Sequence, residues 1–397
     1  MSDPARPATP AAAPPPAAPF DLLRSPDLDL EMRAPRRPGP EVERLLEMAS
    51  AGERLSTAGA LALLRQAPLL DLGVAADLAR RRIHPEPIVT YIVDRNVNYT
   101  NVCVVRCSFC AFYRDPGHPE GYLHPKEILF EKIEETLRLG GTGILMQGGH
   151  HPDLPLEWYE DLLRSFKERF PRLHVHALSP PEIQHIVRIS GVALGEVLRR
   201  LRAAGLDSIP GGGGEILVDA VRRRIAPLKT MSADWLEVMD AAHALGIPST
   251  ATMMFGHVES YADRVAHMEK IRDQQDRSLE RGAAAFTAFI SWTYKAEHTA
   301  LGGHEVGSAE YLRTQAVSRL FFDNIPNIQS SWVTQGKEIG QIALKFGAND
   351  MGSTMIEENV VRAAGAHGCT TRLEIERLIR EAGFVPRQRD TLYRPVS

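Results

Sequence analysis

Three of the chain's four cysteines lie within eight positions of one another. Cys103, Cys107 and Cys110 follow a C-x3-C-x2-C spacing, in a loop that starts where a short β-branched segment ends. Thiolates are the usual protein ligands of iron–sulfur clusters, and a cubane cluster needs four ligands. Three closely spaced cysteines would fill three sites and leave one iron open for a substrate or cosubstrate. The spacing therefore predicts a catalytic [4Fe–4S] cluster.

Two other interpretations of these cysteines are open at this point. A structural zinc site would need a fourth ligand nearby, which His118 could supply, and is usually built from paired C-x2-C units. The three residues could also be incidental core cysteines. Clustered thiols in a large, cysteine-poor chain favour a metal in a reducing compartment. Cys369 stands alone, and we interpret it as an ordinary thiol.

Composition limits the class of protein. The chain has 397 residues, 44% of them hydrophobic, enough to bury the core of one large α/β barrel or two ordinary domains. Its 46 basic and 50 acidic residues give a net charge of −4, which indicates neither nucleic acid nor an anionic membrane as partner. The uncharged run 282–294 is well short of the ~20 residues of a membrane span. The start lacks the pattern of a secretory signal, so we expect a cytoplasmic protein.

The order of the predicted elements indicates an α/β fold. Residues 1–40 are expected to be a disordered Ala/Pro-rich extension, because Pro at this density neither forms helix nor packs a core. Residues 41–85 show helical periodicity, strand and helix patterns alternate over 86–335, and helices dominate 336–397. This favours a TIM-like (β/α) barrel, full or partial, with N-terminal helices and a C-terminal helical extension. We expect strands over 88–93, 143–146, 173–177, 249–254, 284–290 and 327–332, and helices over 125–139, 156–170, 192–204, 232–245, 261–281, 309–322, 335–345, 354–366 and 371–382.

Polar side chains follow the predicted strand ends, where the active sites of such barrels lie. Glu215 follows four glycines and could bind ribose hydroxyls, or could cap backbone amides. His257 ends a strand and could be a catalytic base, or a satisfied structural histidine. Ser179 and Glu182 could belong to the site, or could cap a helix that begins there. Weaker candidates are His150, His151, Asp350, Glu357 and Glu358, and the run Arg222–Arg224 is expected to be a solvated face.

The cysteine spacing resembles the signature of the radical S-adenosylmethionine (SAM) superfamily, which Phe109, the aromatic residue before the last cysteine, also matches. The resemblance implies that Cys103, Cys107 and Cys110 ligate a [4Fe–4S] cluster and that SAM chelates its open iron. It also implies that Phe109 lies against the adenine. The superfamily's glycine-rich segment, which meets the SAM amino group, is matched by Gln147-Gly148-Gly149; glycine lets backbone carbonyls approach an ammonium closely. We add Ser179 and Glu182 to the expected SAM-binding residues.

Further segments resemble the cyclic dehypoxanthine futalosine synthase family, over roughly residues 85–395. They are Asp94-Arg-Asn-Val-Asn-Tyr-Thr-Asn-Val-Cys103, Ser179-Pro-Pro-Glu182-Ile, Ile209-Pro-Gly-Gly-Gly-Gly-Glu215, Ala251-Thr-Met-Met-Phe-Gly-His257 and Gly347-Ala-Asn-Asp-Met-Gly-Ser-Thr-Met-Ile-Glu-Glu358. One segment departs: Thr293-Tyr-Lys-Ala-Glu-His-Thr299 stands where the family usually has Thr-Phe-Gln-Pro-Gly-Asn-Thr.

The resemblance implies a radical cyclase of menaquinone biosynthesis that converts dehypoxanthine futalosine to its cyclic form. A deoxyadenosyl radical would take hydrogen from ribose C4′, and the C4′ radical would add to the benzoate ring. Glu215 and His257 are the expected catalytic residues, and flavodoxin or ferredoxin the expected electron donor. Aminofutalosine synthase, or another radical SAM enzyme acting on a related nucleoside, is the alternative activity. A non-catalytic iron–sulfur or zinc protein is the third hypothesis.

Removing residues 1–38 should leave the enzyme folded and active, because this composition buries little surface. The melting temperature and the specific activity of the truncated chain, compared with those of the full chain, measure this. A marked fall in either would show that the segment packs on the barrel.

Overall fold

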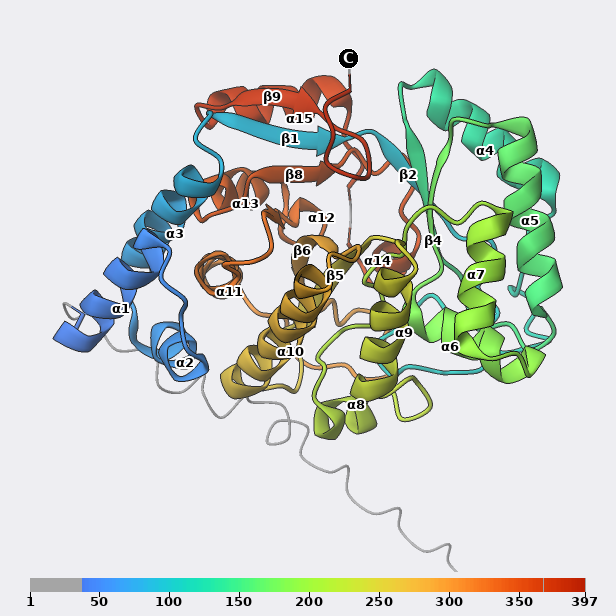
Figure 1. The fold of residues 1–397 in the computed structure, drawn as a ribbon, viewed down its shortest axis with the longest axis horizontal. Helices are drawn as coiled ribbons and strands as arrows, with labels where there is room; N and C mark the ends of the chain where they lie inside the picture. Colours follow the sequence, from blue (N-terminus) through green and yellow to red (C-terminus); the bar gives the residue numbers. More distant parts are fainter. Residues whose placement is uncertain (1–37, 367, 397) are drawn as a thin grey trace, which may run out of the picture.

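The computed structural model describes residues 38–366 and 368–396, so most of the extension predicted over 1–40 lies outside the described residues. All paired strands of this part of the chain run parallel, in two sheets (Figure 1). In chain order they are β1 (Ile88–Ile92), β2 (Asp94–Val97), β3 (Gly143–Met146), β4 (His174–Ala177), β5 (Ser249–Phe255), β6 (Phe286–Thr293), β7 (Asn327–Gln329), β8 (Asp350–Ser353) and β9 (Val385–Gln388). The sheet orders are β5-β6-β7-β8-β1-β9 and β2-β3-β4.

Backbone hydrogen bonds join the two sheets into a ring. On one side, isolated bridges through residues 208–209 connect β4 to β5. On the other side only Val93 separates β1 from β2, and the chain after β8 pairs with both: the Thr354 N–H donates to the Ile92 carbonyl at 3.0 Å and the Ile356 N–H to the Asp94 carbonyl at 3.4 Å. The predicted TIM-like (β/α) barrel is therefore confirmed.

Helices cover the outside of the barrel, and the longer ones bury an apolar stripe. In α5 the buried residues Leu156, Tyr159, Leu162, Leu163 and Phe166 recur at three- and four-residue spacing, as an amphipathic helix requires. The helices after β2 are α4 (Lys126–Arg138), α5 (Leu156–Arg169), α6 (Pro180–Ser190), α7 (Leu194–Ala204), α8 (Asp219–Ile225), α9 (Ser232–Ala244), α10 (Tyr261–Glu280), α11 (Ser308–Phe321), α12 (Trp332–Gln335), α13 (Lys337–Ile342), η2 (Ala343–Lys345), α14 (Val360–Ala363) and α15 (Arg372–Glu381). None of the described helices is long and apolar enough to cross a membrane.

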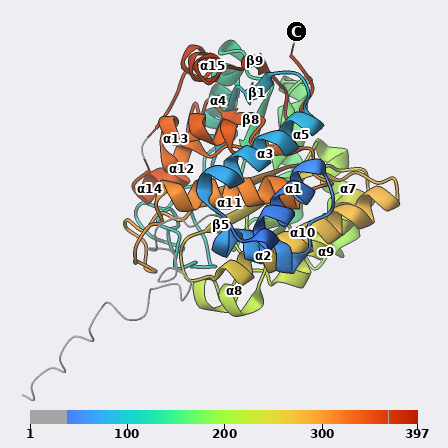
Figure 2. The same cartoon turned by 90° about the vertical axis from the view of Figure 1, so that its left-hand side faces the viewer.

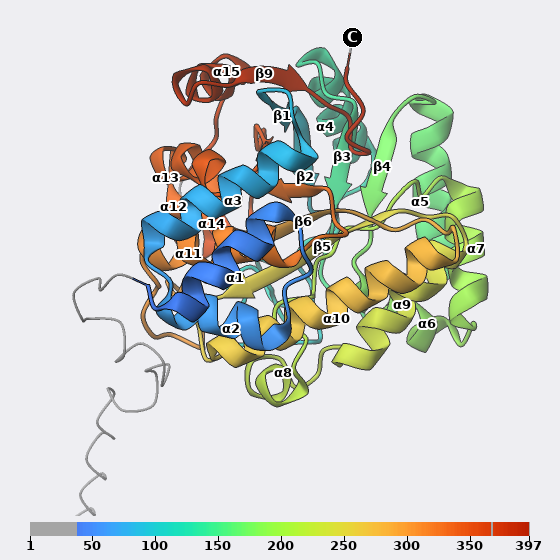
Figure 3. The same ribbon diagram turned by 60° about the vertical axis from the view of Figure 1, so that its left-hand side comes forward.

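Three helices precede the first strand, as the periodicity predicts: α1 (Pro40–Ala51), α2 (Thr57–Gln66) and α3 (Leu69–Ile83). Ser56 caps α2, since its hydroxyl accepts a hydrogen bond from the Gly59 N–H at 3.0 Å. These helices pack on α10 and α11, on one side of the barrel (Figures 2 and 3).

The C-terminal part differs from the prediction. The helix expected over 354–366 is wrong for residues 354–357, which pair with β1 and β2, and only Val360–Ala363 is helical. Strands β8 and β9 were not predicted, because Asp350-Met-Gly-Ser353 and Val385-Pro-Arg-Gln388 lack the apolar run of a buried strand. Their pairing depends on β1, a distant partner that local periodicity does not reveal.

A buried ion pair ties the C-terminal tail to the barrel. Arg389, directly after β9, donates from Nε and from a terminal nitrogen to the two carboxylate oxygens of Asp350, at 2.5 and 2.9 Å. Both side chains are at most 5% exposed. Asp350 also accepts hydrogen bonds from the Thr90 hydroxyl and the Gly352 N–H, so its charge is well compensated. Removing one partner of such a pair leaves a buried charge without compensation.

Arg389→Met should destabilise the protein by about 3–5 kcal/mol, the usual cost of breaking a buried pair from one side. Arg394→Met is the matched control, because Arg394 pairs with Asp390 in the same tail but is 68% exposed, and should cost less than about 1 kcal/mol. Urea unfolding of both variants checks this. Equal effects would show that the Arg389 pair does not hold the tail.

Candidate active site

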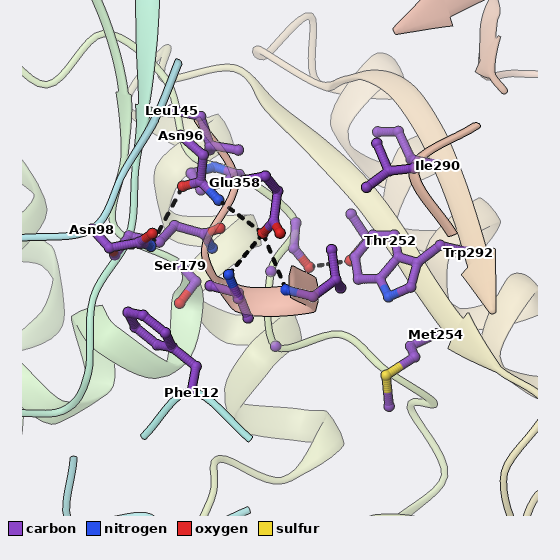
Figure 4. Close-up of a pocket in the computed structure, with 18 of the residues that line it drawn as sticks. Asn96, Asn98, Phe112, Leu145, Ser179, Thr252, Met254, Ile290, Trp292 and Glu358 are labelled. Atoms are coloured by element: carbon purple, nitrogen blue, oxygen red, sulfur yellow. Dashed lines mark hydrogen bonds between the residues drawn. The ribbon is translucent and has the colours of Figure 1, made fainter. Parts of the chain in front are cut away.

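The barrel encloses a cavity of about 410 Å3 lined by alternate residues of its strands. In β5, Thr250, Thr252 and Met254 line the cavity, whereas Ala251 and Met253 are fully buried on the other face. This alternation is the ordinary two-residue period of a strand. Figure 4 shows other side chains that reach into the same space, among them Asn96, Asn98, Leu145, Ile290 and Trp292.

The cysteine loop forms part of this cavity's wall. Cys103 and Cys107 are buried, Cys110 is partly buried, and all three line the cavity. The backbone of the loop is fixed at both ends: the Cys103 N–H donates to the Arg114 carbonyl at 2.9 Å, and the Ser108 N–H to the Ile225 carbonyl at 2.9 Å. Arg106 has a φ of 51°, so the chain makes a left-handed turn between the first two cysteines. The sequence prediction that these three residues converge on one site thus has a structural basis.

The donor set fits a cluster better than a single ion. Among the described residues, no three His, Cys, Asp or Glu side chains are grouped around one metal position. In a cubane each thiolate binds its own iron, so the three sulfurs need not meet at a point. The zinc alternative lacks its fourth ligand, because His118 is exposed, lies outside the cavity lining, and accepts a hydrogen bond from the Glu120 N–H.

Burial raises the pKa of Cys107 to about 12 and raises that of Cys110 as well. Both thiols are therefore protonated at neutral pH unless a positive centre binds them. Metal binding would release these protons, as is usual for thiolate sites.

Gly148 and Gly149 allow the end of β3 to touch the cysteine loop. The Gly149 N–H donates to the Thr100 carbonyl at 2.9 Å. A Cβ on Gly149 would lie 2.2 Å from the Val102 carbonyl oxygen and 3.0 Å from the Cys103 Cβ. No other residue fits there without moving the loop.

Ser179 and Glu182 form a capping box at the start of α6, so the capping interpretation of these residues is confirmed. Glu182 is 3% exposed and accepts four hydrogen bonds. The donors are the Gly148 N–H at 2.9 Å, the Tyr99 hydroxyl at 3.1 Å, and the Ser179 N–H and hydroxyl at 2.8 and 2.6 Å. Both residues line the cavity. Glu182 fixes the glycine-rich strand end through Gly148.

Glu215 lines the cavity close to the cysteines, as predicted for a site residue. Its carboxylate pairs with Lys229 at 2.7 Å, and the Lys229 ammonium lies 5.3 Å from the centre of the Phe109 ring. The other carboxylate oxygen is buried and has no hydrogen-bond partner. A donor such as a ribose hydroxyl could satisfy that oxygen.

His257 does not reach the cavity. Its side chain is fully buried and absent from the cavity lining. Nδ1 accepts from the Val258 N–H at 2.7 Å, and Nε2 lies 3.1 Å from the Met254 carbonyl, which makes Nε2 the protonated nitrogen. Burial lowers the pKa of this histidine. With both nitrogens engaged, His257 has no lone pair to offer a substrate, and this geometry argues against its predicted role as the base.

Family models match two parts of the chain: the Radical SAM superfamily over residues 97–271 and the CofH/MqnC C-terminal region over residues 283–397. The cyclic dehypoxanthine futalosine synthase of Halalkalibacterium halodurans is 48% identical over 353 residues, covering 89% of this chain and 94% of that protein. The synthase of the same name from Streptomyces coelicolor is 48% identical over 357 residues, covering 89% and 88%.

This chain belongs to the radical SAM superfamily, in the family of cyclic dehypoxanthine futalosine synthases. A second group of relatives is less similar: the 5-amino-6-(D-ribitylamino)uracil–L-tyrosine 4-hydroxyphenyl transferase of Methanopyrus kandleri is 40% identical, covering 90% of this chain and 97% of that protein. Membership of the radical SAM superfamily implies a [4Fe–4S] cluster and SAM as cofactors.

Solved structures support the fold alone. The [FeFe]-hydrogenase maturase HydG of Carboxydothermus hydrogenoformans matches with a TM-score of 0.67 at 15% identity, covering 89% of this chain and 81% of that one. Methylornithine synthase matches with a TM-score of 0.64 at 16% identity, covering 86% and 97%. Both likenesses agree with the barrel described above.

Several residues of this radical SAM site were not predicted from sequence. Lys229 stands in an irregular segment with no motif around it, and Arg222 is buried, contrary to the solvated face expected for its run. Glu358, by contrast, was one of the weaker candidates from sequence: it lines the cavity and accepts from the N–H groups of Val360 and Val361, so it caps α14 (Figure 4). Of the two adjacent histidines only His150 lines the cavity.

The loop over residues 293–299, whose sequence differs from the one usual in the family, also lines the cavity. Tyr294 and Lys295 line the cavity, and Lys295 pairs with Glu305 at 2.6 Å. Two residues after this loop, the Leu301 N–H donates to the Ser108 carbonyl of the cysteine loop at 2.7 Å. The loop therefore forms wall that adjoins the cysteines.

Gly149→Ala should lower the iron and sulfide content of the anaerobically reconstituted protein about 10-fold, the usual scale for disturbing the support behind metal ligands. Circular dichroism should show an intact barrel. Gly195→Ala on α7 is the control, because an added Cβ there meets nothing within 4 Å. Full iron content in the Gly149 variant would contradict the close contact.

Proposed function

We propose that this chain converts dehypoxanthine futalosine to cyclic dehypoxanthine futalosine, a step of menaquinone biosynthesis, by radical SAM chemistry. The observation that carries the proposal is that one cavity is lined both by the three cysteines and by polar residues of the barrel interior. A radical formed at the cysteine end would therefore lie in the same cavity as a second bound molecule. The higher identity to the two synthases, 48% against 40% for the transferase, supports this substrate.

Cys103, Cys107 and Cys110 would hold three irons of the cluster and leave the fourth open to the amino and carboxylate groups of SAM. When bound, cluster and SAM supply a 5′-deoxyadenosyl radical. Phe109 lines the cavity beside the cysteines and would lie against the adenine. Backbone carbonyls of Gln147, Gly148 and Gly149 would face the ammonium, with Ser179 and Glu182 holding that strand end in place. Glu215 would accept from ribose hydroxyls through its unpartnered oxygen.

In this proposal the rest of the cavity positions the substrate. Hydrogen would leave ribose C4′ and the C4′ radical would add to the benzoate ring. The ring radical would then give one proton to a base and one electron to the cluster, which SAM cleavage has oxidised, and aromaticity would be restored. Amide and hydroxyl groups of Asn96, Asn98 and Thr252 line the cavity among apolar walls. A few polar groups in a mostly apolar cavity are the usual means of fixing a small ligand's orientation.

Asp94 is our candidate for the group that takes the last proton. Four carboxylates line the cavity. Glu182 and Glu358 are bonded by backbone N–H groups, and Glu215 is paired with Lys229. Asp94 accepts from the Ser353 hydroxyl through one oxygen, and no described residue donates to the other. Burial raises the pKa of Asp94, which makes it a better proton acceptor near neutral pH.

We further propose that the electron donor is a flavodoxin or a ferredoxin and that the enzyme acts in the cytoplasm, where thiols stay reduced. The alternative, aminofutalosine synthase, adds the deoxyadenosyl radical to its substrate. The adenosyl unit then stays in the product, and this difference allows a direct test.

Substrate deuterated at ribose C4′ should give singly deuterated 5′-deoxyadenosine, about one per cyclised product, because the radical only abstracts hydrogen. The full chain is incubated anaerobically with SAM and dithionite, and the products are measured by mass spectrometry. Asp94→Asn should still form deuterated deoxyadenosine while the cyclised product falls, since abstraction precedes proton loss.

Cys107→Ala is the control that should form neither product. Unlabelled deoxyadenosine, or adenosine carbon in the product, would refute the cyclase and leave the radical SAM assignment intact.

A further inference from the structure

A group of three buried charges lies beside the cysteine loop. It consists of Arg222 on α8, Lys229 in the segment after α8, and Glu215 between residue 209 and α8. Their side chains are 3%, 13% and 8% exposed. Two cations thus share one carboxylate.

The two cations contact Glu215 differently. Lys229 takes one oxygen of Glu215 at 2.7 Å, while Arg222 lies 3.9 Å from the other oxygen without a hydrogen bond to it. Arg222 donates instead to the carbonyls of Gly213 and Gly214, at 3.0 and 2.8 Å. Asp219, three residues before Arg222 on α8, accepts hydrogen bonds from the Ser232 N–H and hydroxyl and supplies a second negative charge beside Arg222. Lys229 is therefore the cation of this group that pairs with Glu215 and also lines the cavity.

A bound cluster would be a further negative centre beside Lys229. Lys229 lies 5.3 Å from the ring centre of Phe109, which stands between Cys107 and Cys110 in sequence. The N–H and the hydroxyl of Ser108 both donate to the Ile225 carbonyl at 2.9 Å, so the chain that carries Arg222 and Lys229 is tied to the cysteine loop. Three thiolates on a cubane make a negative centre, and one-electron reduction makes it more negative.

We propose that Lys229 is the electrostatic partner of the cluster and raises its reduction potential. The proposal rests on the proposed function only through the presence of the cluster. A fixed positive charge close by stabilises the reduced state more than the oxidised state, and net charge near a cluster is one determinant of its potential. Glu215 opposes Lys229, so the two residues set the potential in opposite directions.

The test is an EPR-monitored redox titration of the reconstituted full chain without SAM or substrate. At the wild-type midpoint, Lys229→Met should lower the ratio of reduced to oxidised cluster about tenfold, which is 59 mV for a one-electron couple. Glu215→Gln should raise the ratio, and Lys229→Arg should keep it near the wild-type value. Lys295→Met is the matched control: Lys295 also lines the cavity and pairs with a glutamate, but that pair is 20% and 36% exposed. The ratio of reduced to oxidised cluster in Lys295→Met should equal that of the wild type.

An unchanged potential in Lys229→Met with full iron content would overturn the proposal, even if SAM affinity fell, because Lys229 would then serve SAM alone. Potential shifts in the same direction for Lys229→Met and Glu215→Gln would overturn it too. Removing a positive charge and removing a negative charge must shift the potential in opposite directions, whereas disturbed packing need not. If Lys229→Met cannot hold a cluster, the rise expected for Glu215→Gln against the Lys295 control decides. The titration contains no substrate, so a wrong substrate assignment would not affect it.

Discussion

The bent strand formed by β1 and β2 is the constraint on which the site depends. Its first half pairs with β8 and β9, and its second half pairs with β3 and with the chain after β8. The segment β1–β2 thereby closes the barrel and places the cysteine loop at the carboxyl end of β2. Since the loop follows directly from β2, its position is fixed by the hydrogen bonds of the whole ring, and the glycines at the end of β3 let it sit against the neighbouring strand.

Buried charge inside this barrel is arranged so that each carboxylate has a defined set of donors. Glu182 and Glu358 are held by backbone N–H groups, Asp350 by Arg389, and Glu215 by Lys229. Groups held in this way need little reorganisation when charge or spin develops near them, which is the general advantage of a preorganised site. One carboxylate oxygen of Asp94 and one of Glu215 accept no hydrogen bond from the described residues.

Relatives with different reactions share this framework. The barrel is recognisable at 15% identity in HydG, and the transferases at 40% identity cover nearly the whole chain. Chemistry common to the superfamily needs only the cysteine loop and the strand ends around it. Side chains of the barrel interior and of the loop containing Tyr294 and Lys295 form the rest of the cavity wall, and we propose that they select the substrate.

The cysteine triplet, the alternation of strands and helices, and the glycine-rich strand end can all be predicted from local sequence. These features are local, because ligand spacing, hydrophobic period and glycine positions can each be recognised within a few residues of sequence. Only the tertiary structure decided which polar residues share the cavity. In the sequence, His257 and Glu215 are both polar residues near strand ends. In the structure, both ring nitrogens of His257 make hydrogen bonds to backbone groups outside the cavity, whereas Glu215 lines the cavity beside the cysteines. Lys229, Arg389 and the strands β8 and β9 carry no local signal, because their partners lie far away in the chain and meet them only once the barrel has closed.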